Sequence, residues 1–105
     1  MASRREYVDF VLEQLAGAGE VACRPMMGEY VLYYREKVIG GVYDDRLMLK
    51  PVESARALLP MAEMTEPYPG AKPLLLVDAV DDAKLLQRVV VAMYPELPAP
   101  RKKRS

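Results

Sequence analysis

The sequence contains no histidine and only one cysteine, Cys23. A lone cysteine cannot form an intramolecular disulfide. Without histidine, the chain cannot build a Cys/His zinc site, nor a catalytic triad or dyad that uses an imidazole base. It also contains no EF-hand loop and no glycine-rich phosphate loop. An all-carboxylate magnesium or calcium site stays open in principle. We therefore predict no catalytic residues and no cofactor.

Long apolar runs are missing as well. None approaches the ~20 residues that are needed to span a bilayer. The N-terminus, MASRREYVDF, has no apolar core followed by a small-residue cleavage site. We therefore expect a cytoplasmic protein that makes no contact with a membrane.

The net charge is zero, but it is unevenly distributed. Four basic residues follow one another near the C-terminus, namely Arg101, Lys102, Lys103 and Arg104. The rest of the chain has 11 Lys and Arg against 15 Asp and Glu, a net charge of −4. Nucleic-acid binding needs several basic groups on one face. Direct nucleic-acid binding is therefore not expected of the acidic body, and the basic tail is either a binding segment or a solvated terminus.

The 105 residues fit a single domain, for which we predict residues 1–97 followed by a flexible basic tail, 98–105. A first helix is expected over residues 4–16, where Ser3 and Glu6 have the spacing of a capping box. The apolar residues of this segment recur at helical spacing, at Val8, Val11, Leu12 and Leu15.

Four strands are expected next, over residues 21–27, 29–34, 38–43 and 46–50. Short turns separate them, which predicts successive hairpins and therefore a meander. Gly40 and Gly41 lie inside the third strand and indicate a bulge or a close backbone approach. Pro25 has no N–H and points to an edge strand or a strand end.

The second half of the chain is expected to contain two helices and one strand. Residues 52–59 form a helix, 60–73 an irregular proline-rich connection, and 74–77 a fifth strand. Aspartates at 78, 81 and 82 are suited to cap a last helix, which ends before Pro95. The predicted fold is therefore α+β, a two-layer α/β arrangement in the order α-β-β-β-β-α-β-α. An antiparallel meander sheet is backed by helices.

The segment Arg24-Pro25-Met26-Met27-Gly28-Glu29-Tyr30, followed by Tyr33-Tyr34, resembles the signature of the TfoX N-terminal domain family. Its pattern is roughly Arg-x-Met-Phe-Gly-Gly-Tyr, then a hairpin, an acidic pair and a Leu-x-Leu-Lys strand. Asp44-Asp45 and Leu47-Met48-Leu49-Lys50 match the last two parts. Here Met27 replaces Phe and Glu29 replaces the second glycine. The resemblance covers about residues 4–97 and implies an antiparallel sheet backed by helices, with dimerisation as an expectation.

The family takes its name from regulators of natural competence, thought to act with a cyclic-AMP-responsive transcription activator. Its long members carry a second, helical domain that is not found in this sequence. The resemblance therefore implies a non-enzymatic regulatory or protein-interaction domain, with a protein partner or a second copy of the chain. It supplies no catalytic residues.

Six residues of the motif region are candidates for an interface or binding site: Arg24, Gly28, Glu29, Tyr30, Tyr33 and Lys50. Arg24 is suited to anchor a partner or an anion, or to form an ion pair with Glu29 or a nearby acid. The tyrosines form either an interface or half-buried packing. Gly28 is expected to serve a turn.

Other residues have a structural and a functional interpretation. Asp44-Asp45 is interpreted as a turn, against a carboxylate pair for acid/base or metal chemistry. Cys23 is expected to be a small buried residue. Core filling is favoured over an adaptable binding surface for the methionines, including Met26, Met27, Met61 and Met64.

Two alternatives to the interaction domain stay open. The first is a small-molecule binding protein or an unrecognised enzyme, with Arg24, Glu29, Tyr33 or Lys50 as polar groups of a pocket. The second, ranked last, is nucleic-acid binding through the tail.

Overall fold

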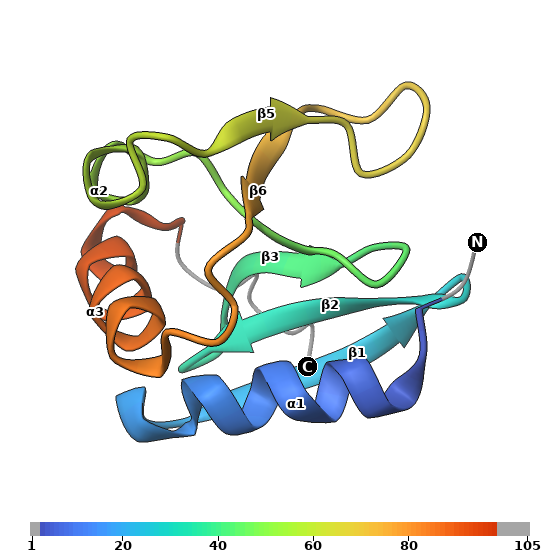
Figure 1. Cartoon of the computed structure of the whole chain (residues 1–105), viewed down its shortest axis with the longest axis horizontal. Helices are drawn as coiled ribbons and strands as arrows, with labels where there is room; N and C mark the ends of the chain where they lie inside the picture. Colours follow the sequence, from blue (N-terminus) through green and yellow to red (C-terminus); the bar gives the residue numbers. More distant parts are fainter. Residues whose placement is uncertain (1–2, 99–105) are drawn as a thin grey trace, which may run out of the picture.

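A six-stranded antiparallel sheet is packed on one side by three helices (Figure 1). The structure, a computed structural model, describes residues 3–98. The elements in chain order are α1 (Arg5–Leu15), the 3₁₀ turn η1 (Ala16–Ala18), β1 (Val21–Met26), β2 (Glu29–Tyr34), β3 (Lys37–Val42), β4 (Leu47–Leu49), α2 (Glu53–Leu58), β5 (Glu63–Thr65), β6 (Leu74–Val77), α3 (Ala83–Met93) and the 3₁₀ turn η2 (Tyr94–Glu96).

The predicted α+β class and element order are confirmed, with one addition. Strand order in the sheet is β1-β2-β3-β4-β6-β5, so β1 to β4 form the expected meander. The segment 60–73 was expected to be irregular, but it contains β5, which pairs with β6 at the far edge of the sheet. The proposed tail, including Arg101, Lys102, Lys103 and Arg104, lies outside the described residues.

Three two-residue turns join the strands of the meander. Both central residues of every turn have positive φ, which is the backbone of the type I′ turn that matches the twist of two paired strands. The three pairs are Met27 and Gly28 (53° and 85°), Arg35 and Glu36 (50° and 74°), and Asp44 and Asp45 (55° and 56°). Only one of these six residues is glycine, so the pairing of the strands holds five other side chains in a conformation that they rarely adopt.

The paired glycines of β3 lie where the backbone comes closest to its neighbours. A Cβ on Gly40 would stand 2.0 Å from the Met48 carbonyl oxygen, and one on Gly41 would stand 2.5 Å from the Tyr30 carbonyl oxygen. The β2–β3 register shifts between Leu32 and Tyr33, opposite these glycines. Both the bulge and the close approach that the sequence predicts are therefore present.

The two faces of the sheet have different roles. Alternate strand residues such as Leu32, Val42 and Leu49 pack with apolar residues of all three helices into one buried cluster. The intervening residues face the other way, because side chains alternate along a strand. We call this second surface the open face; it carries Arg24, Val31, Tyr33, Gly41, Met48 and Leu76. It is open at the β1–β2 edge, where Arg24 is exposed, whereas Gly41, beside the Tyr43 ring, and Met48 are buried.

The N-terminal cap of α3 agrees with the sequence prediction, and that of α1 does not. The Asp82 carboxylate accepts a hydrogen bond from the Leu85 N–H at 3.1 Å and caps α3, as predicted. The predicted capping box at Ser3 and Glu6 is wrong. Arg4 is the N-cap of α1 and no side chain caps it, because the Ser3 hydroxyl bonds to residues distant in sequence.

Within residues 3–98, no helix is both long and apolar enough to cross a membrane.

Candidate functional site

The side chains of Arg24 and Tyr33 meet on the open face. The Arg24 guanidinium lies 5.8 Å from the centre of the Tyr33 ring, within the range of a cation–π contact. Arg24 is exposed and Tyr33 is half-buried. The predicted ion pair of Arg24 with Glu29 is not formed. Such a pair presents a charged group and a rigid ring to a partner. Arginine and tyrosine are also among the side chains that are enriched at the centre of protein interfaces.

Two exposed methionines follow Arg24 along the chain. Met26, in β1, is 41% exposed, and Met27, in the following turn, is 97% exposed. Met61, in the turn after α2, and Met64, in β5 at the far edge of the sheet, are also exposed, at 90% and 51%. The prediction that these four residues fill the core is wrong. Large apolar side chains that remain in contact with solvent at an arginine–tyrosine pair are typical of a binding surface.

The open face is bordered by the edge strand β1. Pro25 lies in this strand, as its missing N–H predicts. Cys23 is half-buried rather than buried as expected, and its Sγ lies 3.8 Å from Nη1 of Arg5. Within β1, residues 24–26 are all exposed. Among residues 3–98 no strand pairs with the outer side of β1, so this edge of the described sheet can pair with a partner strand.

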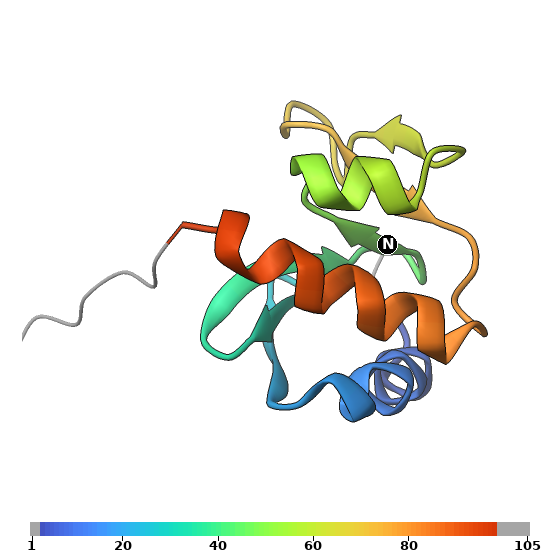
Figure 2. The ribbon, with the colours of Figure 1, turned by 90° about the vertical axis from the view of Figure 1, so that its left-hand side faces the viewer.

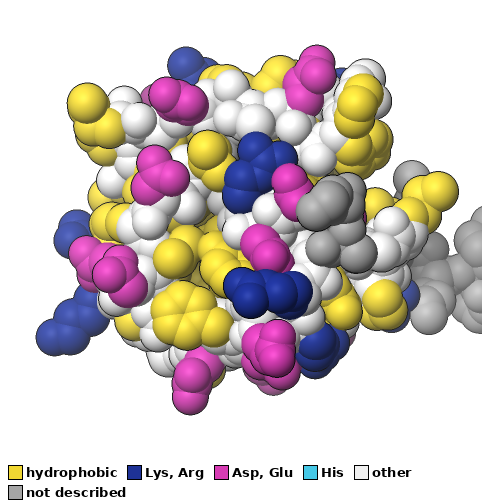
Figure 3. Space-filling view, turned by 45° about the vertical axis from the view of Figure 1, so that its right-hand side comes forward, with side chains coloured by type: hydrophobic (Ala, Val, Ile, Leu, Met, Phe, Trp, Pro, Cys, Tyr) yellow, Lys and Arg dark blue, Asp and Glu magenta, His cyan; other side chains and the backbone are white. Residues whose placement is uncertain are grey.

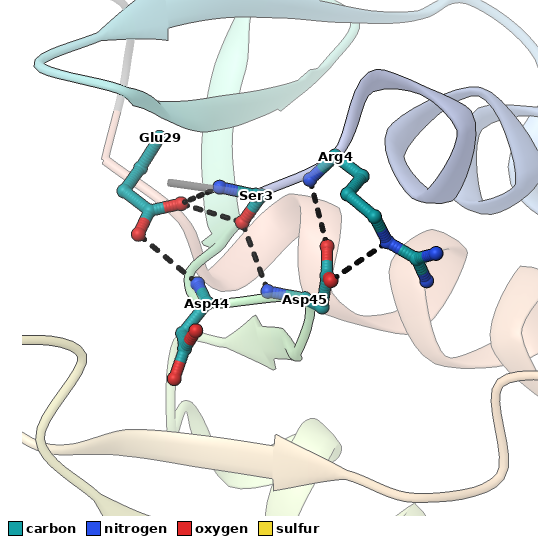
Figure 4. Close-up of polar contacts among 5 residues, drawn as sticks. All are labelled: Ser3, Arg4, Glu29, Asp44 and Asp45. Atoms are coloured by element: carbon teal, nitrogen blue, oxygen red, sulfur yellow. Dashed lines mark hydrogen bonds and ion pairs between the residues drawn. The ribbon is translucent and has the colours of Figure 1, made fainter. Parts of the chain in front are cut away.

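Glu29 occupies a polar cluster and not a pocket (Figure 4). Its carboxylate accepts hydrogen bonds from the Ser3 N–H at 3.0 Å, from the Ser3 hydroxyl, and from the Asp44 N–H at 3.0 Å. The Ser3 hydroxyl oxygen in turn accepts from the Asp45 N–H at 3.0 Å. We call Ser3, Arg4, Glu29, Asp44 and Asp45 the Glu29 cluster. It joins the N-terminal segment to the β1–β2 and β3–β4 turns.

The acidic pair Asp44-Asp45 forms a turn, as predicted. Arg4 donates to the Asp45 carboxylate from its backbone N–H at 2.8 Å and from Nε at 2.9 Å. These hydrogen bonds, the backbone one first, and the charge of Arg4 lower the pKa of Asp45. Among residues 3–98, no three His, Cys, Asp or Glu side chains are grouped in a way that could hold a metal ion.

The remaining candidates lie apart from Arg24 and Tyr33. Tyr30 faces the helices, where its ring lies 5.6 Å from the Arg5 guanidinium and packs against the core. Gly28 has a φ of 85° and forms the β1–β2 turn, as expected. Lys50 follows β4, and its N–H bonds to the Ile39 carbonyl at 2.8 Å. The six candidates therefore do not converge on one pocket.

Two sets of contacts around these residues could not be predicted from local sequence patterns. Ser3 and Asp45 meet although 42 residues separate them, and Arg5 reaches Tyr30 and Cys23 across two elements. The only local indication was that Glu29 stands at a position where the family motif has glycine.

On the side that Figure 3 shows, basic and acidic side chains alternate around apolar ones, so no continuous basic patch is presented there.

Comparison with known proteins gives a family and a relative. The model of the TfoX N-terminal domain matches residues 13–95. A protein of Spirochaeta aurantia, described as "Uncharacterized 12.7 kDa protein in trpE 5'region", is 36% identical over 106 aligned positions. The alignment takes in the whole of this chain and 92% of the relative. No solved structure matches. The family match over most of the chain and the full-length similarity agree: the chain belongs to the TfoX N-terminal domain family.

Proposed function

We propose that this chain is a non-enzymatic regulatory domain that acts by binding a protein partner through the open face of its sheet. The observation that carries the proposal is the Arg24–Tyr33 pair, 5.8 Å apart, beside the exposed Met26 on a face that no described helix covers. An arginine stacked on an aromatic ring keeps its N–H donors free for a carboxylate of a partner.

The structural roles of the other motif residues support this assignment. Gly28 and Asp44-Asp45 form turns, and Glu29 holds the N-terminal segment. These polar groups are occupied by the fold and are not directed into a shared cavity. The exposed Arg24 and Met26 beside the half-buried Tyr33, on a sheet and outside any shared cavity, suit recognition of another macromolecule better than chemistry on a small molecule.

The proposal is tested with a photo-crosslinking amino acid at position 26 of the full chain in its native cells, which leaves Arg24 and Tyr33 in place. A matched chain carries the same group at position 72, which is exposed in the loop between β5 and β6. We expect a protein crosslinked from 26 and not from 72, identified by mass spectrometry.

The purified partner is then titrated against Arg24→Ala and Tyr33→Ala, with Lys72→Ala as control. Removing a central arginine or tyrosine is expected to weaken binding by about tenfold or more, and the control is expected to bind as the wild type does. The proposal is wrong if position 26 gives no specific product, or if the captured protein binds all three variants equally.

A further inference from the structure

Strand β1 forms the edge of the described sheet that carries Arg24 of the Arg24–Tyr33 pair. Along residues 3–98 no strand lies beyond it. All three helices pack on the other face of the sheet, where Figure 2 shows α3 between α2 and the end of α1. An unpaired edge strand presents N–H and C=O groups with which a second extended segment can pair. What fits this edge therefore depends on which backbone groups point outward.

The register of the β1–β2 hairpin fixes these groups. Met26 and Glu29 flank the two-residue turn, so they exchange both of their backbone hydrogen bonds. In an antiparallel pair the bonded positions alternate with non-bonded ones, so every second residue back from Met26 also bonds to β2. The same alternation continues at Glu20, whose C=O accepts from the Arg35 N–H at 2.8 Å. The odd-numbered residues of β1 therefore direct their backbone groups outward.

The outward groups are the N–H and C=O of Val21 and of Cys23, and the C=O of Pro25. No other described backbone segment bonds to them. Pro25 has no N–H, and at this position the missing donor would have pointed outward, so the β1–β2 hairpin loses no bond. The edge thus offers two donors and three acceptors to a partner strand.

The side chains along this edge add a charge to the pairing. Arg24 and Met26 face the open side of the sheet and are exposed. Within residues 3–98 the Arg24 guanidinium forms no ion pair. In an antiparallel pair the partner residue opposite Arg24 occupies a non-hydrogen-bonded position, where side chains lie closest. An acidic residue there neutralises Arg24, and an apolar residue opposite Met26 covers its side chain.

A second copy of β1 is a poor match for this edge. Two such strands in antiparallel pairing would each place Pro25, which has no donor, in the shared ladder. They would also bring two Arg24 side chains together on one face, and like charges on neighbouring strands weaken the pairing. The edge therefore favours a segment of a different protein, with a negative charge where β1 has a positive one.

We infer that the partner adds an extended segment antiparallel to β1, as a seventh strand beside the six of the sheet. In this segment an acidic residue follows two positions after an apolar one, so that the apolar residue lies opposite Met26 and the acidic residue opposite Arg24. The inference rests on the proposed function, because it names the kind of partner that binds beside the Arg24–Tyr33 pair.

Amide hydrogen exchange of the isotope-labelled full chain, followed by NMR, tests the pairing directly. The probes are synthetic peptides that were first selected on the full chain from a phage-displayed random library. We expect them to share the apolar–any–acidic spacing. In the free chain the Val21 and Cys23 amides should exchange faster than those of Ala22 and Arg24, which bond to β2. With a selected peptide bound, the exchange of Val21 and Cys23 should slow by at least about tenfold.

Two variants separate backbone pairing from charge. Cys23→Pro removes an outward donor at a position that, like Pro25, gives no N–H to the hairpin, and Arg24→Glu reverses the charge. Circular dichroism checks that both variants fold. We expect each to weaken binding of the selected peptides by about tenfold or more. Lys72→Glu changes the net charge as much as Arg24→Glu does, and we expect it to bind as the wild type does.

The inference is overturned if panning enriches no peptide, or if the bound peptides leave Val21 and Cys23 unprotected. Capture of a partner from position 26 is a separate result. If nothing is captured there although the peptides protect both amides, the regulatory role fails and the strand pairing stands. If a captured partner leaves both amides unprotected in its complex, the strand pairing fails and the proposed function stands.

Discussion

Replacing Glu29 tests whether one carboxylate holds the N-terminal segment to two turns of the sheet. Its side chain accepts three hydrogen bonds, two from Ser3 and one from the Asp44 N–H. A net contribution of about 1 kcal/mol for each bond sets an upper value near 3 kcal/mol for Glu29→Ala. Asp44 is exposed and its N–H can turn to water, and the Ser3 N–H also reaches the Gly28 carbonyl at 3.3 Å. We therefore expect a loss of about 2 kcal/mol in the free energy of unfolding.

The measurement is urea unfolding followed by circular dichroism, with thermal unfolding alongside. A loss of about 2 kcal/mol lowers Tm by roughly 8–16 °C in a domain of this size, with an unchanged m-value. Glu29→Gln keeps one acceptor and loses the charge, so we expect about half of the effect. Glu20→Ala is the matched control, because Glu20 is exposed and its side chain makes no hydrogen bond within residues 3–98.

A double-mutant cycle with Ser3→Ala measures the shared bond directly. Because Ser3 and Glu29 contact each other, the double variant is expected to lose less than the sum of the single variants, by about 0.5–1 kcal/mol. If Glu29→Ala stays within about 0.5 kcal/mol of the wild type, the range of an ordinary surface substitution, the Glu29 cluster does not stabilise the fold.

Three further predictions concern backbone conformation and pH. Glu36 has a φ of 74°, so Glu36→Gly should raise the free energy of unfolding by about 0.5–1 kcal/mol in urea, whereas Glu20→Gly, a residue without positive φ, should lower it. Gly40→Ala places a Cβ 2.0 Å from the Met48 carbonyl oxygen and should cost more than about 3 kcal/mol or prevent folding. Gly70→Ala, with no atom within 4 Å, should cost only about 1 kcal/mol, and equal Tm values for the two would contradict the close approach. The lowered pKa of Asp45 means that its stabilising contribution is present above its unfolded pKa and is lost as pH falls through the lower folded value. Unfolding curves between about pH 6 and pH 2 should therefore show a smaller acid loss for Asp45→Asn than for the wild type.

Strand positions could be predicted from the sequence because their causes are local. Alternating apolar residues and short polar turns place β2 and β6, and β6 is found at the predicted residues 74–77. Asp82 caps α3 through a bond that spans three residues. In contrast, β5 is three residues long and has two exposed side chains. It forms because β6 offers a free edge, and nothing in its own sequence indicates this.

The Ser3 error has the same physical basis. Ser3 and Glu6 fit a capping box, and a local rule can consider only the next turn of the helix. Instead the hydroxyl bonds to Glu29 and to the Asp45 N–H, 26 and 42 residues away. The ion pair expected between Arg24 and Glu29 failed for the same reason, since the Glu29 carboxylate is already occupied by the N-terminal segment and the β3–β4 turn. Arg24 is left to stack on Tyr33.

The structural roles of the motif residues indicate which of them are free to bind a partner. Glu29 stands where the family pattern has a second glycine, and it needs no glycine because it begins β2 without a positive φ, unlike Gly28 before it. Its side chain contributes a contact that glycine could not make. Gly28, Glu29 and the Asp44-Asp45 pair are therefore all engaged in shaping the β1–β2 and β3–β4 turns. Of the six candidates, Arg24 and Tyr33 are the two that the structure places together on the open face, and an effect of their substitution on partner binding without loss of stability would separate recognition from folding in this motif.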